Sequence, residues 1–224
     1  MATRDDVLQY GVNNADLLVG AGIILIQSST NWDITGFSAT AFPAKLGDII
    51  DLSGTTIGRA KSENGWRNMG HTDGLKPMDR ARETQTLGSD QVPEVRTTSI
   101  KWTHKVTGTL LETNATNLND LFTAHPSGVQ TVSGDVPTEY RLSLGAPAGI
   151  KYHRIAVLHP DVEGRLWGYV YAMSEIHGTG GPTFNPSDKH GWPFEALCYP
   201  DSRIADVNDR VLRVYYTDKN FFTQ

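Results

Sequence analysis

Five segments in the last part of the chain have the composition of β-strands. Most of them are rich in β-branched or aromatic residues, and most end at Gly, Pro, Asp or Asn. They span residues 139–144, 152–158, 166–176, 192–199 and 211–216. Short strands separated by turn-forming residues favour a mainly β domain.

The segment 166–176 carries large apolar residues on both faces of the expected strand. Trp167, Tyr169, Tyr171 and Met173 occupy one face, and Leu166, Val170 and Ala172 occupy the other. Because successive side chains of a strand point to opposite faces, we expect other parts of the protein to cover this strand on both sides.

Two more strands are expected closer to the N-terminus. Segment 17–26 is rich in β-branched residues and is interrupted by Gly20 and Gly22, which predicts a strand with a bulge. In segment 99–106 an alternating pattern predicts a half-buried strand, with Ile100, Trp102, His104 and Val106 on one face.

One helix is expected after the capping residues Thr113 and Asn114. Leu118, Leu121 and Phe122 follow at spacings of three and four residues, and Pro126 prevents the helix from continuing. The pattern predicts a helix of about three turns that covers one side of a sheet.

The N-terminal part of the chain differs from the rest. Residues 1–64 alternate short apolar runs with clusters of Gly, Ser, Thr and Asn. We predict an N-terminal arm at 1–13, a single domain at 14–224 and, inside this domain, a long insertion loop at about 27–64. A further stretch at about 75–96 is dense in charges of both signs and has little apolar periodicity, which predicts an exposed hairpin or long charged loop.

The charge distribution argues against tight nucleic-acid binding. The net charge is -5 at pH 7, and residues 1–58 contain six Asp against one Arg and one Lys. No block of basic residues is present that would neutralise phosphates. DNA that meets this protein is therefore expected to slide past it.

Cys198 is the only cysteine, so an internal disulfide and multi-thiolate zinc sites are excluded. A reducing compartment is expected. Residues 1–10 lack the pattern of a secretory signal, and the longest apolar run, 17–26, is too short to span a bilayer. We therefore expect no membrane partner.

Nucleotide-binding and nucleophile motifs are incomplete or missing. The run Gly20-Ala21-Gly22 could open a dinucleotide fingerprint, but Leu25 stands where the third Gly belongs and no helix pattern follows. A nucleophile elbow of the form GxSxG is absent, and Cys198 lies in an expected strand, which favours a small core residue over a nucleophile.

Histidines and carboxylates give no recognisable metal or catalytic pattern. The seven His are widely separated: His71, His104, His125, His153, His159, His177 and His190. On one regular strand, His153 and His159 would lie about 20 Å apart, too far for shared ligation.

Asp5 with Asp6 and Asp206 with Asp209 are interpreted as solvated loop acids, although an acid–base role stays open. Asn114-Ala115-Thr116 matches a glycosylation acceptor but is interpreted as a helix cap. We predict no catalytic, cofactor-binding or metal site.

Two motifs and the order of the elements resemble the major tail proteins of long-tailed, siphovirus-type bacteriophages, particularly those that infect actinobacteria. The first motif is Ala15-Asp16-Leu17-Leu18-Val19-Gly20, and the second is the turn Gly65-Trp66-Arg67-Asn68-Met69-Gly70-His71-Thr72-Asp73-Gly74. The block 110–114 before the helix, the strand that contains Trp192-Pro193-Phe194 and a last strand ending in Tyr215 and Tyr216 are also similar to the family. The resemblance covers residues 14–224.

The resemblance implies a structural protein rather than an enzyme. The expected fold is mainly β (α+β), a β-sandwich or barrel-like subunit with one flanking α-helix. Six copies would close into a ring, and rings would stack into a hollow tail tube around the tape measure protein. Tail terminator and tail tip proteins would be further partners, and viral DNA would pass through the lumen during ejection. Such a protein assembles in the host cytoplasm and ends in the virion tail, which by resemblance is non-contractile.

Two other readings remain open. The chain could be a carbohydrate- or receptor-binding β-sandwich at a phage tail tip, in which aromatic residues such as Trp32 or Trp167 form a sugar platform. A hydrolase built from scattered Asp, Glu and His is the third. Binding of glycans by a soluble monomer would favour the former, and a pH-dependent activity lost with one carboxylate would favour the latter.

Overall fold

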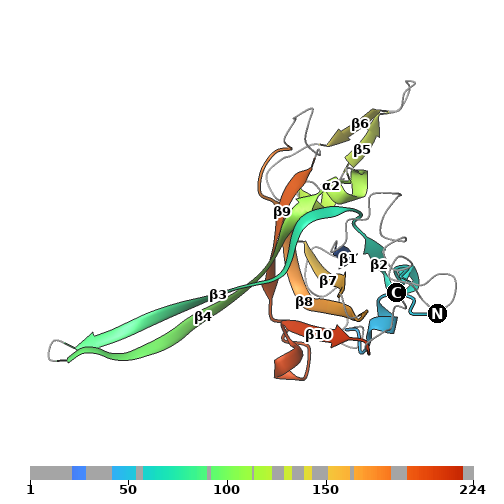
Figure 1. Ribbon diagram of the computed structural model, residues 1–224. Coiled ribbons are helices and arrows are strands. Elements are labelled where there is room, and N and C mark those ends of the chain that lie inside the picture. Colours follow the sequence, from blue (N-terminus) through green and yellow to red (C-terminus); the bar gives the residue numbers. More distant parts are fainter. Residues whose placement is uncertain are drawn as a thin grey trace.

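The computed structural model describes residues 22–28, 42–53, 58–89, 92–112, 114–122, 129–132, 139–142, 151–161, 164–182 and 191–218. These residues form a mainly β protein with an eight-stranded antiparallel sheet, a separate two-stranded hairpin and one α-helix (Figure 1). The mainly β prediction is therefore confirmed. The strands of the large sheet are β1 (Ile23–Ser28), β2 (Trp66–Asn68), β3 (Thr72–Ser89), β4 (Val92–Leu110), β7 (Tyr152–Pro160), β8 (Leu166–Gly178), β9 (Trp192–Tyr199) and β10 (Leu212–Tyr216).

The large sheet is rolled, because its first and last strands follow each other in the chain. The strand order is β2-β1-β7-β8-β9-β4-β3, and residues 69–71 alone separate β2 from β3. The amide of Met69 donates to the Ile24 carbonyl at 3.1 Å, and the Thr72 hydroxyl donates to the Gly22 carbonyl at 3.2 Å. The chain that enters β3 therefore still runs along β1, which gives a barrel-like arrangement.

Strand β8 organises the sheet because it pairs with three other strands. It pairs with β7 along one edge. On its other edge, β10 pairs with residues 167–171 and β9 pairs with residues 173–178. The two halves of β8 consequently have different surroundings.

Both faces of the sheet are covered. In β1, Ile24 and Ile26 belong to one hydrophobic cluster, whereas Ile23 and Leu25 belong to the other. The first, the inner cluster, collects side chains from β1, β4, β7, β8 and β9 and fills the roll. The second, the outer cluster, lies on β1, β7 and β8. The expectation that 166–176 is covered on both sides is confirmed for residues 170–174 and Ile176, whereas Trp167 and Tyr169 are only half-buried.

The outer cluster is covered largely by the segment predicted as an insertion loop. Phe42, Leu46, Ile49 and Ile50 are buried there, around the 3-10 helix η3 (Leu46–Asp48). A second 3-10 helix, η5 (Ser62–Asn64), leads into β2. Phe42, Leu46, Ile49 and Ile50 thus belong to the core, and Leu52 and Ala60 pack against it.

The helix α2 (Ala115–Leu121) is shorter than predicted. Asn114 caps it, as expected, because its side-chain oxygen accepts from the amide of Asn117 at 2.9 Å. The helix ends at Phe122, whose backbone leaves the helical region, so α2 has about two turns rather than three. Leu121 is buried in the inner cluster, and the Phe122 ring packs edge-on against Trp192 with centroids 5.2 Å apart. This hydrophobic contact fixes the end of the helix.

Most predicted strands are present with small shifts in their bounds. β9 coincides with the prediction, and β7 and β8 each run two residues further. β10 begins one residue later than predicted, and β6 is described over Glu139–Leu142, two residues short of its predicted end. β6 pairs with β5 (Val129–Val132), which was not predicted. The strand predicted at 17–26 is described only from Ile23 onward. The N-terminal arm predicted at 1–13, which is not the hairpin described below, lies outside the described residues.

The strand predicted at 99–106 is part of the much longer β4. Trp102 was expected on its covered face, but the side chain is 47% exposed. The reason is that β4 pairs with β9 only from His104 to Leu110, so no third strand lies beside Trp102. The charged stretch 75–96 lies almost wholly in β3 and β4 and forms a hairpin, one of the two forms expected.

We expect Ile50→Ala to lower the free energy of unfolding by about 2–5 kcal/mol, because it opens a cavity in the outer cluster. Ile50 is fully buried. The measurement is urea unfolding of the purified protein. Val207→Ala, at a position that is 68% exposed, serves as the control and should change stability by less than about 0.5 kcal/mol. Equal effects of the two variants would contradict a core role for residues 42–53.

Candidate functional site: a projecting hairpin

The most distinctive surface feature is the hairpin of β3 and β4, which projects far from the body of the protein (Figure 1). Its two strands pair from Thr72 with Leu110 to Ser89 with Val92. At about 3.3 Å per residue, the stretch from Val92 to Thr103 reaches roughly 40 Å. We call this stretch, with its partner residues in β3, the arm.

The arm has two open edges. β9 leaves β4 after His104, and among the described strands β3 and β4 of the arm pair only with each other. Their outward N–H and C=O groups can therefore pair with another chain. Pro77 and Pro93 stand near the two ends of the arm, and no proline lies between them in β3 or β4. Four register shifts interrupt the pairing, and such irregularities increase the twist of a hairpin.

The base of the arm is anchored in the inner cluster. The Tyr171 hydroxyl donates to the Pro77 carbonyl at 2.7 Å. Burial raises the pKa of Tyr171, so the hydroxyl keeps the proton that it donates. A Cβ at Gly108 would lie 3.2 Å from both Leu75 and Phe194, so a larger residue there would require these side chains to shift.

Three side chains at the base of the arm form an exposed group that we call the root patch: Met78, Arg80 and Trp102. Met78 is 52% exposed and Trp102 47%. The Arg80 guanidinium lies over the Trp102 ring, 3.9 Å from its centroid. Desolvation, and secondarily the Arg80 charge, lowers the pKa of the adjacent His104. Exposed Trp, Met and Arg together are typical of protein interfaces.

A buried acid ties the helix to the sheet. Asp120 of α2 is 1% exposed, and its carboxylate binds Arg67 of β2 and, at 2.7 Å, the ammonium group of Lys151. Burial alone would raise the pKa of Asp120. The opposing effects are larger and bring this pKa below its usual value: the charges of protonated His153, Arg67 and Lys151, and the hydrogen bond from Lys151. Asn117 extends the network, accepting from Arg67 at 2.7 Å and donating to the Met69 carbonyl at 2.7 Å.

A second buried network lies under the outer cluster. Arg154 and Asp201 are both fully buried, with 4.0 Å between their charged groups. Arg154 also donates to Gln27 at 3.1 Å, and Asp201 pairs with Arg203 at 2.8 Å. Burial lowers the pKa of Arg154 to about 10, so it stays charged at neutral pH. These charges hold β1, β7 and the turn after β9 together.

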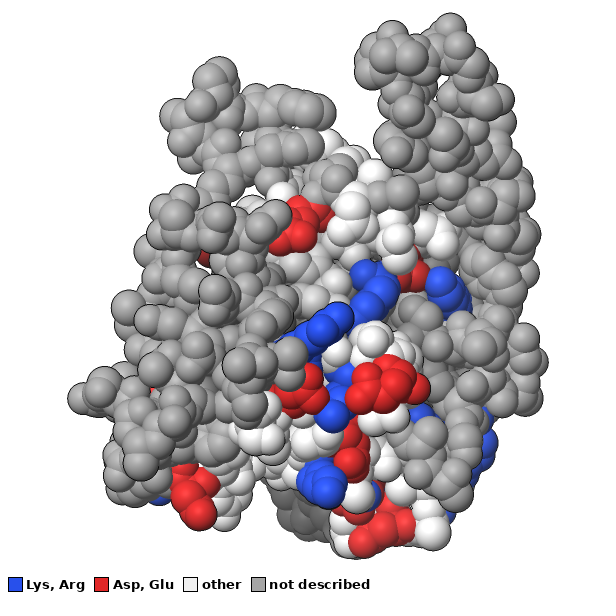
Figure 2. Space-filling model, turned by 90° about the vertical axis from the view of Figure 1, so that its right-hand side faces the viewer, with Lys and Arg blue, Asp and Glu red and all other residues white. Residues whose placement is uncertain are grey.

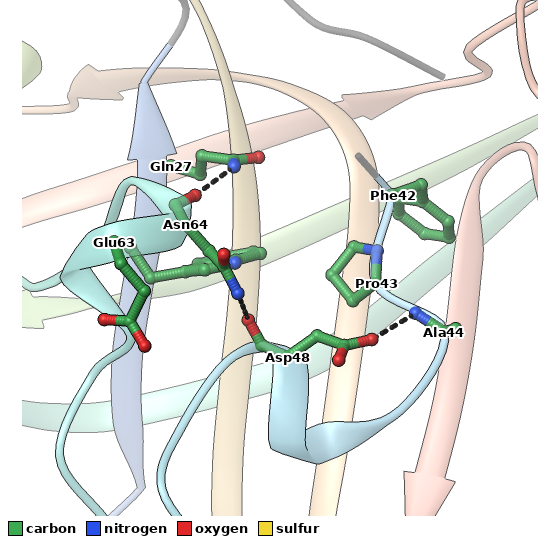
Figure 3. A pocket seen from close by; sticks show the side chains of 8 residues that line it. Gln27, Phe42, Pro43, Ala44, Asp48, Glu63 and Asn64 are labelled. Atoms are coloured by element: carbon green, nitrogen blue, oxygen red, sulfur yellow. Dashed lines mark hydrogen bonds between the residues drawn. The ribbon is translucent and has the colours of Figure 1, made fainter. Parts of the chain in front are cut away.

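A surface pocket of about 540 Å³ lies beside η3 and η5 (Figure 3). Gln27, Glu63 and Asn64 lie on one side of it and Phe42 and Pro43 on the other (Figure 3). The wall makes its own hydrogen bonds: Gln27 donates to the Asn64 carbonyl at 2.6 Å, and Asn64 donates to the Asp48 carbonyl at 2.9 Å. The Asp48 carboxylate accepts from the Ala44 amide at 2.9 Å. These contacts shape the pocket wall and do not indicate a particular ligand.

The charges visible on one face are of both signs. Figure 2 shows Lys and Arg interleaved with Asp and Glu among the described residues there, without a large basic area. Such a mixed surface does not provide the basic footprint that phosphate backbones require.

The residues considered from sequence have mainly structural surroundings. Cys198 is buried in β9, where Ser174 donates to its sulfur at 3.4 Å and burial raises its thiol pKa to about 12, which disfavours the reactive thiolate. Asp206 caps the 3-10 helix η6 (Val207–Asp209) by accepting from the Asn208 amide, and Asp209 pairs with Arg213. Asp5, Asp6, His125 and His190 lie outside the described residues.

The histidines do not converge in the described part of the chain. His153 and His159 both lie in β7, and His153 is next to Asp120, with 4.0 Å between its Nε2 and the carboxylate. No group of three or more His, Cys, Asp or Glu that could hold a metal occurs within the described ranges. The root patch and the Asp120 network were not recognised from sequence. Only the tertiary pairing reveals them, since directly bonded members such as Arg67 and Asp120 are 53 residues apart in the chain.

Comparison with known proteins adds no assignment. No protein-family model matches the chain. No curated protein matches it either. Among the residues that the structure describes, no helix has the length and apolar character needed to cross a membrane.

Acidification should destabilise the subunit through His153. Burial lowers the pKa of His153 to about 4, against opposing attraction from Asp120. A histidine whose folded-state pKa lies below its unfolded value of 6.5 stabilises the protein fully above pH 6.5, and this contribution is lost as the pH falls toward 4. The lowered pKa of Asp120 adds a loss in the same direction at more acidic pH. We expect the free energy of unfolding to fall between pH 7 and pH 4.

The test is urea unfolding of wild type and His153→Gln across this pH range. The neutral amide cannot titrate, so the variant should show a flatter dependence between pH 6.5 and pH 4, whatever its stability at pH 7. Parallel curves for the two proteins would contradict a titrating role for His153.

Proposed function

We propose that this chain is the tail tube subunit of a long-tailed, siphovirus-type bacteriophage. In this proposal six copies form a ring, and rings stack into a hollow tube through which viral DNA passes. The observation that carries it is the arm, a long hairpin whose two edges find no further strand in the described part of its own subunit. Exposed edges of this length favour pairing with another chain, and closed rings satisfy them without open-ended aggregation.

The rolled body supports a structural role. Its inner and outer clusters and two buried charge networks make a rigid block from which the arm extends (Figure 1). An arm of roughly 40 Å is long enough to cross a neighbouring subunit or to reach the next ring. Many weak contacts repeated along a tube become collectively strong.

The proposed partners follow from this assembly. The subunit contacts itself within and between rings, the tape measure protein in the lumen, and terminator and tip proteins at the two ends of the tube. A net charge of -5 with no basic block suits a lumen through which DNA slides without sticking. The proposal assigns the chain no catalytic, cofactor-binding or metal role, and places it in the virion tail after assembly in the host cytoplasm.

One observation supports a second candidate function. Trp167 and Tyr216 pack together with ring centroids 5.1 Å apart, and Tyr216 is 65% exposed. The Trp167 indole donates to Asp161 at 2.8 Å. An exposed aromatic pair with a polar neighbour resembles a sugar platform, so a carbohydrate- or receptor-binding module at a tail tip is the alternative. Trp32, the other aromatic considered, lies outside the described residues.

Negative-stain microscopy of the purified protein across a concentration series tests the proposal. Rings or tubes of uniform diameter would support the tail tube subunit. A protein that stays monomeric at every concentration, also with added tail tip complex, and binds glycans in an array would contradict it and favour the alternative.

Shortening the arm should weaken assembly more than folding. Replacing residues 84–100 by Asn-Gly joins Glu83 to Lys101, which already face each other in the register, through a two-residue hairpin turn. The body should keep its unfolding midpoint within a few degrees, because the pairing of β4 with β9 that joins the hairpin to the body spans His104–Leu110 and is left intact. Tube length and yield in micrographs should fall sharply. Tubes of normal length and yield would refute a role of the arm in assembly.

A further inference from the structure

The exposed face of β8 and β10 forms a second apolar surface, which we call the platform: Trp167, Tyr169, Val214 and Tyr216. Trp167 is the register partner of Tyr216, and Tyr169 is the partner of Val214, so these side chains share one face of the sheet. Val214 is 41% exposed and Tyr216 65%. The alternate residues of β10 turn the other way, since Tyr215 packs on the outer cluster and Arg213 lies over Phe42.

The platform is exposed because the roll ends beneath it. Tyr169 and Leu212 touch the edge of the inner cluster, so the platform continues the inner face of the sheet. β9, however, pairs with β8 only from Met173 onward. Beside residues 167–171 of β8, β10 therefore takes the place that β9 takes further along the strand.

The root patch and the platform together contain most of the exposed large apolar side chains. Within the described residues these are Met78 and Trp102 in the root patch, Val214 and Tyr216 on the platform, and Val207 in η6 next to β10. Exposed apolar surface gathered in two places, rather than scattered singly, is typical of interaction sites. The two places lie on different parts of the molecule, because the arm leaves the body on one side and β10 runs toward the other (Figure 1).

Charge makes the two surfaces complementary. In the root patch, Arg80 is exposed and lies over Trp102. Beyond the platform, Asp218 is exposed two residues after Tyr216. Arg213, the nearest cation in β10, is engaged by Asp209 on the other face. If another copy presented its Arg80 here, the guanidinium would meet the Asp218 carboxylate at the end of the platform.

We propose that the root patch of one copy packs on the platform of the next, so that two different surfaces of the same chain form the contact that closes the ring. This inference rests on the proposed function and identifies the contact that it needs. A contact between unlike surfaces repeats head to tail, and it makes a closed ring when the rotation between copies divides a full turn. Trp102 and Tyr216 are its central residues, with Arg80 and Asp218 at the rim.

Disulfide trapping between two single-cysteine variants tests the contact directly. Trp102→Cys and Tyr216→Cys are prepared separately, mixed at a concentration that gives tubes and oxidised with copper phenanthroline. Native Cys198 is buried and its thiol pKa is raised to about 12, so it should not contribute. The mixture should give covalent dimers, whereas each variant alone should not. Ser62→Cys, at an exposed position on η5, replaces Tyr216→Cys in the control mixture and should not cross-link with Trp102→Cys.

A charge exchange gives a second measurement that does not depend on removing an aromatic side chain. Arg80→Glu and Asp218→Arg should each raise the concentration needed for half-assembly roughly tenfold. The double variant should restore assembly, because the Glu of each copy then meets the Arg of the next. Circular dichroism and thermal unfolding of each variant check that the body is folded.

The outcomes separate this inference from the proposed function. Two results would overturn the contact if wild-type protein forms tubes: no cross-linking in the mixture of the Trp102 and Tyr216 variants, or equal cross-linking in the Ser62 control. Neither result would contradict the proposed function as a tube subunit. Wild-type protein that forms no rings or tubes would instead count against the function. Specific cross-linking together with rescue by the double variant supports the contact.

Discussion

The pairing of β4 with β9 over His104–Leu110 is the interaction on which the architecture depends. It joins the β3–β4 hairpin to the rest of the sheet, so that Val106 and Leu110 reach the inner cluster. It also ends abruptly, and from that point the hairpin continues alone. The same strand therefore belongs to the core at one end and to an open-edged arm at the other, and the position where β9 leaves it sets the root of the arm.

Buried charges, rather than apolar contacts alone, fix the parts that surround this roll. The Asp120 network joins α2 to β2 and to the start of β7, and the Arg154–Asp201 network joins β7 to the turn after β9. Breaking such a buried pair is costly because it leaves one charge without compensation. Each network thus specifies one position of its element, and the proposed function as a repeating tube subunit would require this uniformity.

Assembly gives a common explanation for features that look unfavourable in a single subunit. Long open edges, an exposed Trp and an exposed Tyr invite association. In the proposed tail tube these features would become ring contacts. The mixed charges of the surface, visible in Figure 2, limit unspecific association. The proposed contact between the root patch and the platform uses one such feature from each side of the molecule.

The sequence by itself determined the β class, the bounds of β9, the cap of α2 at Asn114 and the double-sided burial of β8 from Val170 onward, because alternation, turn residues and capping chemistry are local signals. It also indicated the charged hairpin, although not its projection. Only the tertiary structure decided that Trp102 is exposed, that residues 42–53 enter the core, and that Asp120 meets Lys151 and His153. These outcomes depend on which strands are neighbours, and pairing between residues far apart in the chain leaves no pattern in local sequence.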